Sequence, residues 1–164
     1  SYWSIFATPV AGITYGANGI WPWLSPGERI LNHGDKGGVT GWKKSIEFPG
    51  SIQMGYLAGF MREFEWWNLY PANDILADQP GEEIFNHWIS VVKSPENEII
   101  IAYIPQKGEV RLFNPGGYKY SGRWFDPVTG QFSKADISQK DNNIIVNQNF
   151  DNDMLIVLSI ICEN

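Results

Sequence analysis

Two pairs of acidic or histidine residues, Glu63 with Glu65 and His33 with Asp35, are spaced closely enough in the sequence to suggest shared proton transfer or metal binding. Glu63 and Glu65 are two residues apart in a segment of helical periodicity, and positions two apart on a helix point to different sides. They do not form a catalytic carboxylate pair, and we expect both to be solvated. His33 with Asp35 could form an acid–base or metal pair, but a solvated loop histidine is favoured, because their glycine-rich stretch lacks the ending of a phosphate-binding loop. The sequence therefore predicts no catalytic residue, no metal site and no cofactor.

An acidic turn and a single cysteine are the other candidates for ligand chemistry. Asp151, Asn152 and Asp153 could bind calcium through oxygen ligands, although a polar hairpin turn is the favoured interpretation. Cys162 stands alone, so neither an internal disulfide nor a zinc cluster of cysteines can form. Because Cys162 lies in an apolar run, we predict a buried, small apolar side chain.

The composition is rich in aromatic residues, which make up 15% of the 164 residues, whereas charged residues make up 18%. So many large apolar side chains, with a formal net charge of only -6, argue against a disordered chain. The acidic balance argues against a nucleic-acid binder that neutralises phosphates. No apolar run is long enough to span a membrane. The composition indicates a folded protein with an unusually high share of aromatic side chains.

The chain divides near residue 75, and we predict two units, residues 1–74 and 75–164. Six of the eight tryptophans lie before residue 70, and the composition then shifts to Ile, Val, Asn and Asp. In the first unit, residues 2–7 could end a helix and residues 12–16 form a candidate strand bounded by glycines. The clearest helix covers residues 51–68, with Ser51 as its N-cap. Its apolar residues at helical spacing are Met54, Leu57, Met61 and Phe64.

The second unit has the pattern of short strands separated by turn residues, which is typical of an antiparallel sandwich or jelly roll. Residues 98–104 and 154–158 are nearly continuous apolar runs, which belong at the centre of a sheet covered on both faces. The aromatic helix is one candidate for the second cover. The fold class is therefore mainly β, with a C-terminal antiparallel β-sandwich. The candidate strands are residues 87–92, 98–104, 109–113, 118–125, 131–133, 143–147 and 154–162.

Three stretches resemble a known family when taken in order. They are GITYGANGIW at residues 12–21, PGSIQM at 49–54 and RWFDPVTG at 123–130. They resemble the C-terminal part of the apiosidase-like glycoside hydrolases, bacterial polysaccharide-degrading enzymes with a (β/α)8 barrel followed by a small β-sandwich. The resemblance implies that residues 1–74 are a barrel remnant, with the last strand, rim loop and last helix, and that residues 75–164 are the accessory sandwich. The chain departs from the family at Val128, where the family usually carries Arg.

The resemblance also implies where sugars would bind. In a barrel enzyme the active site lies at the C-terminal ends of the strands. Tyr15, Asn18, Trp21 and Trp23 would stand there, with rings against the apolar faces of sugars and polar groups on the hydroxyls. The alternative is that these rings pack the loop onto the barrel rim. The family's catalytic carboxylates lie on earlier strands, so no catalytic residue carries over, and we expect the chain alone to be inactive.

The expected function is a C-terminal fragment of a bacterial glycoside hydrolase that is secreted, periplasmic or at the cell surface. Its partners would be a polysaccharide or oligosaccharide and the remainder of the barrel, from the same protein or a separate chain. The alternative is a non-catalytic module that binds carbohydrate or collagen, because the family's sandwich carries the name of a collagen-binding domain of a collagenase. A third possibility is a structural domain that mediates chain association.

Overall fold

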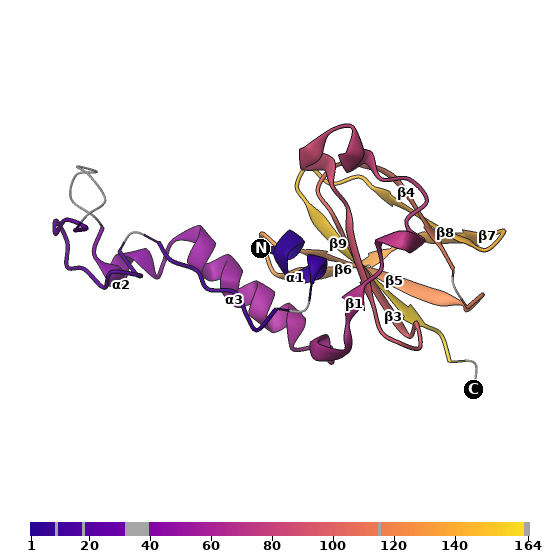
Figure 1. Cartoon of the computed structure of the whole chain (residues 1–164), viewed down its shortest axis with the longest axis horizontal. Coiled ribbons are helices and arrows are strands. Elements are labelled where there is room, and N and C mark those ends of the chain that lie inside the picture. Colours follow the sequence, from indigo (N-terminus) through magenta and orange to yellow (C-terminus); the bar gives the residue numbers. More distant parts are fainter. Residues whose placement is uncertain (9, 18, 32–39, 115, 163–164) are drawn as a thin grey trace.

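The chain forms a β-sandwich from which an arm, with the described residues 10–17, 19–31 and 40–48, projects to one side (Figure 1). Two helices, α1 (Tyr2–Ala7) and α3 (Pro49–Met61), lie between the arm and the sandwich, and α2 (Trp42–Ser45) lies within the arm. None of the described helices is long and apolar enough to cross a bilayer. The computed structural model describes residues 1–8, 10–17, 19–31, 40–114 and 116–162.

The described strands form two antiparallel sheets, with the orders β1-β2-β3-β9-β5-β6 and β4-β8-β7. The last strand in the sequence, β9, lies in the middle of the larger sheet between β3 and β5. The prediction of a mainly β chain with an antiparallel sandwich and one long helix is therefore confirmed. The strands are β1 (Tyr70–Pro71), β2 (Ser90–Lys93), β3 (Ile99–Ile104), β4 (Gly108–Phe113), β5 (Tyr120–Asp126), β6 (Gln131–Ala135), β7 (Ile137–Lys140), β8 (Asn143–Gln148) and β9 (Met154–Ile160). Short 3₁₀ helices occupy Trp66–Asn68, Asn73–Ile75, Pro80–Glu82 and Phe85–His87.

The larger sheet is buried on both faces. Successive side chains of a strand point to opposite faces, so Ile100 and Ile156 face the smaller sheet, whereas Ile101 and Val157 face the helices. All four side chains are fully buried. The near-continuous apolar runs of β3 and β9 follow from this double burial, as predicted.

Helices α1 and α3 supply the cover on the outer face of the larger sheet. Phe6 and Phe60 are each only 1% exposed, and the ring of Phe60 lies 4.5 Å from that of Phe125 on β5. Burying one such side chain stabilises the fold by about 2–3 kcal/mol. The aromatic helix is therefore the second cover of the sheet.

The long helix differs from the helix predicted over residues 51–68, since it spans Pro49–Met61. Proline suits the first turn of a helix, where its missing N–H would have no helical partner. The N-cap is Phe48 and not Ser51, whose hydroxyl donates to the carbonyl oxygen of Ser45 at 2.9 Å. After the helix the chain makes turns and a 3₁₀ helix, because it must redirect into the edge strand β1.

Three smaller expectations are also corrected. The strand predicted over residues 12–16 is wrong, because extended backbone needs a neighbour for its hydrogen bonds, and no described strand pairs with this segment. Strand β7 was not predicted, because ISQK is polar and lies at a sheet edge with little burial. Cys162 is exposed and not buried, since β9 ends at Ile160.

The turn between β5 and β6 is held by the carboxylate of Asp126. Its Oδ1 accepts the backbone N–H of Val128 at 2.8 Å, and its Oδ2 accepts the hydroxyl of Thr129 at 2.9 Å. Its Oδ1 also accepts the side-chain amide of Asn152 at 2.9 Å, from the turn that precedes β9. The carboxylate of Asp126 therefore holds the turn between β5 and β6 and joins it to the turn before β9.

The same turn is a docking surface for α3. Gly130 has a φ of +70°, which favours glycine, and an added Cβ there would lie 2.6 Å from Cδ1 of Tyr56 on α3. Glycine therefore serves both the backbone conformation and the close approach of the helix.

We expect Gly130→Ala to lower the free energy of unfolding by about 2–4 kcal/mol, from backbone strain together with the clash against Tyr56. Gly117→Ala is the matched control, because Gly117 has a φ of +65° but its Cβ would meet only Asn142 Oδ1, at 3.8 Å. In the Gly117→Ala control, the free energy of unfolding should fall by only about 1–2 kcal/mol. Urea denaturation measures both, and equal losses in the two variants would contradict the docking role.

Candidate functional site

The arm presents a pair of stacked tryptophans. The rings of Trp23 and Trp42 are 4.3 Å apart at an angle of 14°, and the ammonium of Lys43 lies 5.7 Å from the centre of the Trp42 ring. Trp23 is 61% exposed. Exposed, flat indole surfaces of this kind are suited to ligands with apolar C–H faces.

Small residues hold the arm in shape. The backbone N–H of Trp42 donates to the carbonyl oxygen of Leu24 at 2.9 Å, and a Cβ on Gly41 would lie 2.7 Å from Cδ of Pro26. The fully buried Ser45 donates its hydroxyl to the carbonyl oxygen of Thr40 at 3.1 Å. These contacts join the chain near Leu24 and Pro26 to α2 through backbone and small side chains.

Trp23 adopts a left-handed backbone with a φ of 54°. For a bulky residue this conformation costs on the order of 1–2 kcal/mol, and such strain is concentrated at functional positions. The strained backbone thus presents the most exposed ring of the stacked pair.

A cavity of about 510 Å³ lies beside the stacked pair. It combines one indole face with hydroxyl groups and ammonium groups, which could donate hydrogen bonds to the hydroxyls of a saccharide. Its lining residues are Ser25, Pro26, Thr40, Gly41, Trp42, Lys43 and Lys44.

The predicted sugar-contacting residues do not form one cluster. Trp21 is 52% exposed and packs beside Gly16. Trp23 belongs to the stacked pair, whereas Tyr15 lies in a second pocket near the start of α3. Asn18, together with His33 and Asp35, lies outside the described residues. Sugar contact at these positions stays a prediction.

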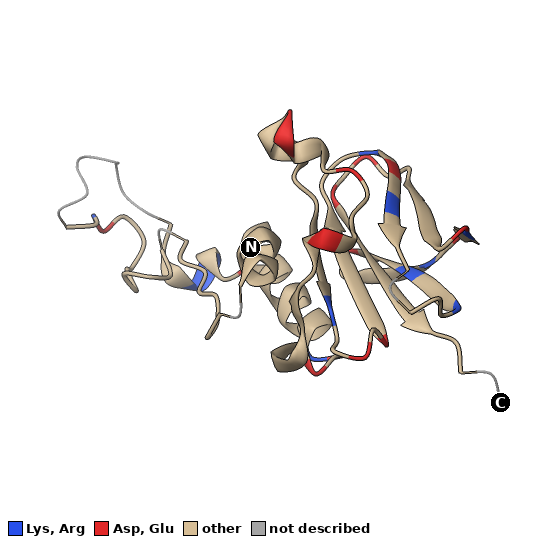
Figure 2. Ribbon diagram, turned by 45° about the vertical axis from the view of Figure 1, so that its right-hand side comes forward, with Lys and Arg blue, Asp and Glu red and all other residues tan. Residues whose placement is uncertain are grey.

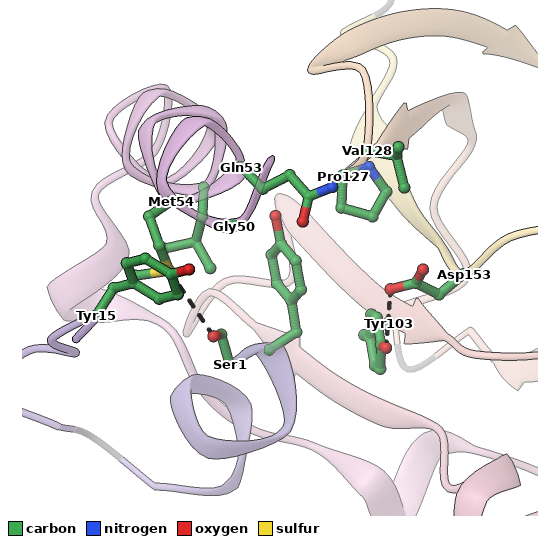
Figure 3. A pocket seen from close by; sticks show the side chains of 11 residues that line it. Ser1, Tyr15, Gly50, Gln53, Met54, Tyr103, Pro127, Val128 and Asp153 are labelled. Atoms are coloured by element: carbon green, nitrogen blue, oxygen red, sulfur yellow. Dashed lines mark hydrogen bonds between the residues drawn. The ribbon is translucent and has the colours of Figure 1, made fainter. Parts of the chain in front are cut away.

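The second pocket has a volume of about 250 Å³ and lies where α1 and α3 meet the sandwich (Figure 3). The hydroxyl of Tyr103 donates to Oδ2 of Asp153 at 2.9 Å, and the ring of Tyr2 stacks on Tyr103 with centres 5.3 Å apart. Burial and the negative charge of Asp153 both raise the pKa of Tyr2 and of Tyr103 above the ordinary value. The tyrosines therefore stay neutral hydrogen-bonding groups.

Several lining residues escaped prediction. Trp42 and Lys43 begin a short helix after the arm's long irregular stretch, and the only signal in the sequence was the tryptophan itself. Gln53, Tyr103 and Asp153 come from three separate elements, so no local spacing could have joined them. In the described residues, no group of three or more His, Cys, Asp or Glu is placed to hold a metal ion.

The chain is similar to parts of known glycoside hydrolases. Residues 1–68 match the model of a family described as the apiosidase-like catalytic domain. A solved structure described as a glycoside hydrolase is 24% identical, with a TM-score of 0.80, over 99% of this chain and 36% of its own. A glycoside hydrolase family 5 structure from Bacteroides vulgatus is 22% identical, with a TM-score of 0.77, over 97% of this chain and 34% of its own. Among curated proteins, none matches the chain.

The chain thus spans about a third of the length of these two solved structures, and its fold is shared with part of each. The resemblance inferred from the three sequence stretches is confirmed by the family match over residues 1–68.

We expect the chain to lose stability as the pH rises above about 10, where exposed tyrosines ionise. The raised pKa values of Tyr2 and Tyr103 keep both neutral in the folded state, so the unfolded state releases its protons first. The stability that Tyr2 and Tyr103 contribute is fully present below about pH 10 and is lost progressively as the pH rises further. Tyr103→Phe should flatten the fall of the melting temperature between about pH 9 and about pH 11. The same slope in the variant and in the unaltered chain would contradict this assignment.

Proposed function

We propose, because residues 1–68 match the model of the apiosidase-like catalytic domain, that this chain is the C-terminal portion of a bacterial glycoside hydrolase that acts on polysaccharides. Residues 1–74 would supply the last strand, rim loop and last helix of a (β/α)8 barrel. Residues 75–164 would be the accessory sandwich that braces it. The catalytic carboxylates would come from the remainder of the barrel, in the same protein or a separate chain.

The observation that carries the proposal is the number of large apolar side chains that residues 1–68 leave exposed. Exposed apolar side chains that gather into a patch mark interaction surfaces. Helix α3 carries no charged residue on any face (Figure 2). The exposed large apolar side chains of this segment are Tyr15, Trp21, Trp23, Leu31, Ile46, Ile52, Trp66 and Trp67.

A row of small residues on α3 indicates where a partner surface would pack. Gly55 and Gly59 are exposed, one helical turn apart, and a Cβ at either would meet nothing within 4 Å. Glycine weakens a helix, so two exposed glycines are unfavourable in this chain by itself. Close approach by the remaining barrel elements would account for both.

The bracing role of the sandwich is supported by polar contacts outside the buried sheet face. Trp3 Nε1 donates to the carbonyl oxygen of Trp88 at 2.8 Å, and Arg123 forms an ion pair with Glu63 at 2.7 Å. The ion pair is exposed and adds little stability, but it joins the segment after α3 to β5.

In this proposal the arm is the rim loop, and Tyr15, Asn18, Trp21 and Trp23 contact the polysaccharide. The exposed Trp23–Trp42 pair and its adjoining cavity support this role. An enzyme that degrades polysaccharides too large to enter a cell would be secreted, periplasmic or at the cell surface.

We expect Gly59→Ala to raise the free energy of unfolding of the 164-residue chain by about 0.5–1 kcal/mol, because alanine is the better helix former and its methyl group meets open space. In a longer protein with the complete barrel, the same methyl group would lie in the interface and lower stability. Urea denaturation of both proteins gives the comparison. Destabilisation of the 164-residue chain would show that this helix face is already packed, against the proposal.

We expect the chain alone to hydrolyse no aryl glycoside or plant polysaccharide and to be retained on the matching insoluble polysaccharide. Trp23→Ala should reduce that retention about tenfold or more, because stacking on an aromatic ring is lost. Trp67→Ala is the control, since Trp67 is 65% exposed but follows α3, at the opposite end of that helix from the Trp23–Trp42 pair.

Turnover by the isolated chain would exclude a fragment that lacks its catalytic residues. Retention on collagen in place of polysaccharide would favour the non-catalytic binding module. No retention on either material would leave the bracing role alone and contradict sugar contact by the arm.

A further inference from the structure

The pocket at the junction of α1, α3 and the sandwich combines residues that are far apart in the sequence (Figure 3). Tyr15 comes from the arm, Gln53 from α3, Tyr103 from β3 and Asp153 from the turn before β9. Ligand pockets occur preferentially at such junctions between structural units. The stacked tryptophans of the arm do not line this pocket.

One buried hydroxyl in the wall of this pocket has no hydrogen-bond partner. Tyr2 lines the pocket and is 8% exposed, and its hydroxyl is unpaired among the described residues. Buried hydroxyls are nearly always bonded, because an unpaired one loses its hydration without compensation. The hydroxyl of Tyr2 therefore lacks a partner that an occupant of the pocket could provide.

The remaining lining divides into polar and apolar parts. The amide of Gln53 donates and accepts hydrogen bonds, the carboxylate of Asp153 accepts them, and the hydroxyl of Tyr15 can do both. The ring of Tyr15 lies close to the start of α3, where a Cβ on Gly50 would come within 2.5 Å of its hydroxyl. The apolar lining residues are Met54, Leu57, Pro127 and Val128.

We propose that this pocket binds a single unit of a neutral sugar. The carboxylate of Asp153, which already accepts the hydroxyl of Tyr103, can accept a further donor, and the hydroxyl of Tyr2 needs a partner. A sugar hydroxyl can donate to the first and accept from the second. The C–H face of a sugar ring suits the apolar wall. A volume of 250 Å³ equals the share of about eight water molecules, which is room for one ring and not for a chain of rings.

Charged ligands match the pocket less well. An anion would be repelled by Asp153, and among the described lining residues no side chain is basic. An ammonium group would pair with Asp153 but has no lone pair to accept the proton of Tyr2. A neutral ligand whose groups both donate and accept hydrogen bonds, as sugar hydroxyls do, can bond both residues.

The test is titration of the 164-residue chain with glucose, galactose, xylose and arabinose, and with glucuronate and glucosamine as charged probes, followed by ligand-observed NMR. We expect at least one neutral sugar to bind. Tyr2→Phe should weaken that binding about tenfold. The same variant should raise the melting temperature of the free chain by about 2–4 °C, because it no longer buries an unpaired hydroxyl.

Tyr120→Phe is the matched control. The hydroxyl of Tyr120 donates to the carbonyl oxygen of Asn97 at 2.8 Å, outside the pocket. Losing this satisfied bond should lower the melting temperature and leave sugar binding unchanged. Gly50→Ala is a second variant, which should weaken binding by displacing the ring of Tyr15 although alanine favours the helix.

The proposal is overturned if no neutral sugar binds, if a charged probe binds more tightly, or if folded Tyr2→Phe binds with unchanged affinity. Loss of binding in Trp23→Ala, with binding kept in Tyr2→Phe, would assign the sugar to the arm. That result would reject the junction pocket while supporting the proposed function, so the two ideas fail separately.

Discussion

The packing of α1 and α3 against the outer face of the six-stranded sheet holds the two parts of the chain together. Val92, Ile101, Phe125, Leu155 and Val157 would face water without it, and a sheet that is apolar on both faces needs two covers. Helix α3, with thirteen residues and no charge, would in turn be marginal alone. Each part therefore depends on the other, and the turn that contains Gly130 fits their surfaces together.

This mutual dependence does not extend to the arm. Its rings Trp23 and Trp42 stack on each other, and Trp21 and Trp23 stay exposed, whereas Trp124 in the sandwich is only 4% exposed. The chain thus combines covered aromatic side chains in the sandwich with exposed ones in the arm. The family match over residues 1–68 includes the arm.

Much of the sandwich could be predicted from the sequence, because its strands are marked by local patterns. The apolar runs of β3 and β9 and the hydrogen bonds of Asp126 depend on neighbours close in sequence. The segment at residues 12–16 has a similar local pattern, but none of the described strands pairs with it, which a local pattern cannot reveal. The junction pocket was beyond prediction for a different reason. An unpaired hydroxyl at Tyr2 is a property of three-dimensional packing, and Tyr103 and Asp153 are fifty residues apart.

The central place of β9 in the sheet has a consequence for synthesis on the ribosome. The sheet cannot close until the final strand appears, because β3 and β5 are joined only through it. About 90 residues separate the end of α3 from the start of β9. At a synthesis rate of ~5–20 residues per second, the sheet face that α3 covers is therefore completed ~5–20 s after the helix has been made. During that interval we expect chaperones to bind the tryptophan-rich segment, because its apolar side chains are uncovered. In a chain truncated before residue 154 these side chains would stay uncovered.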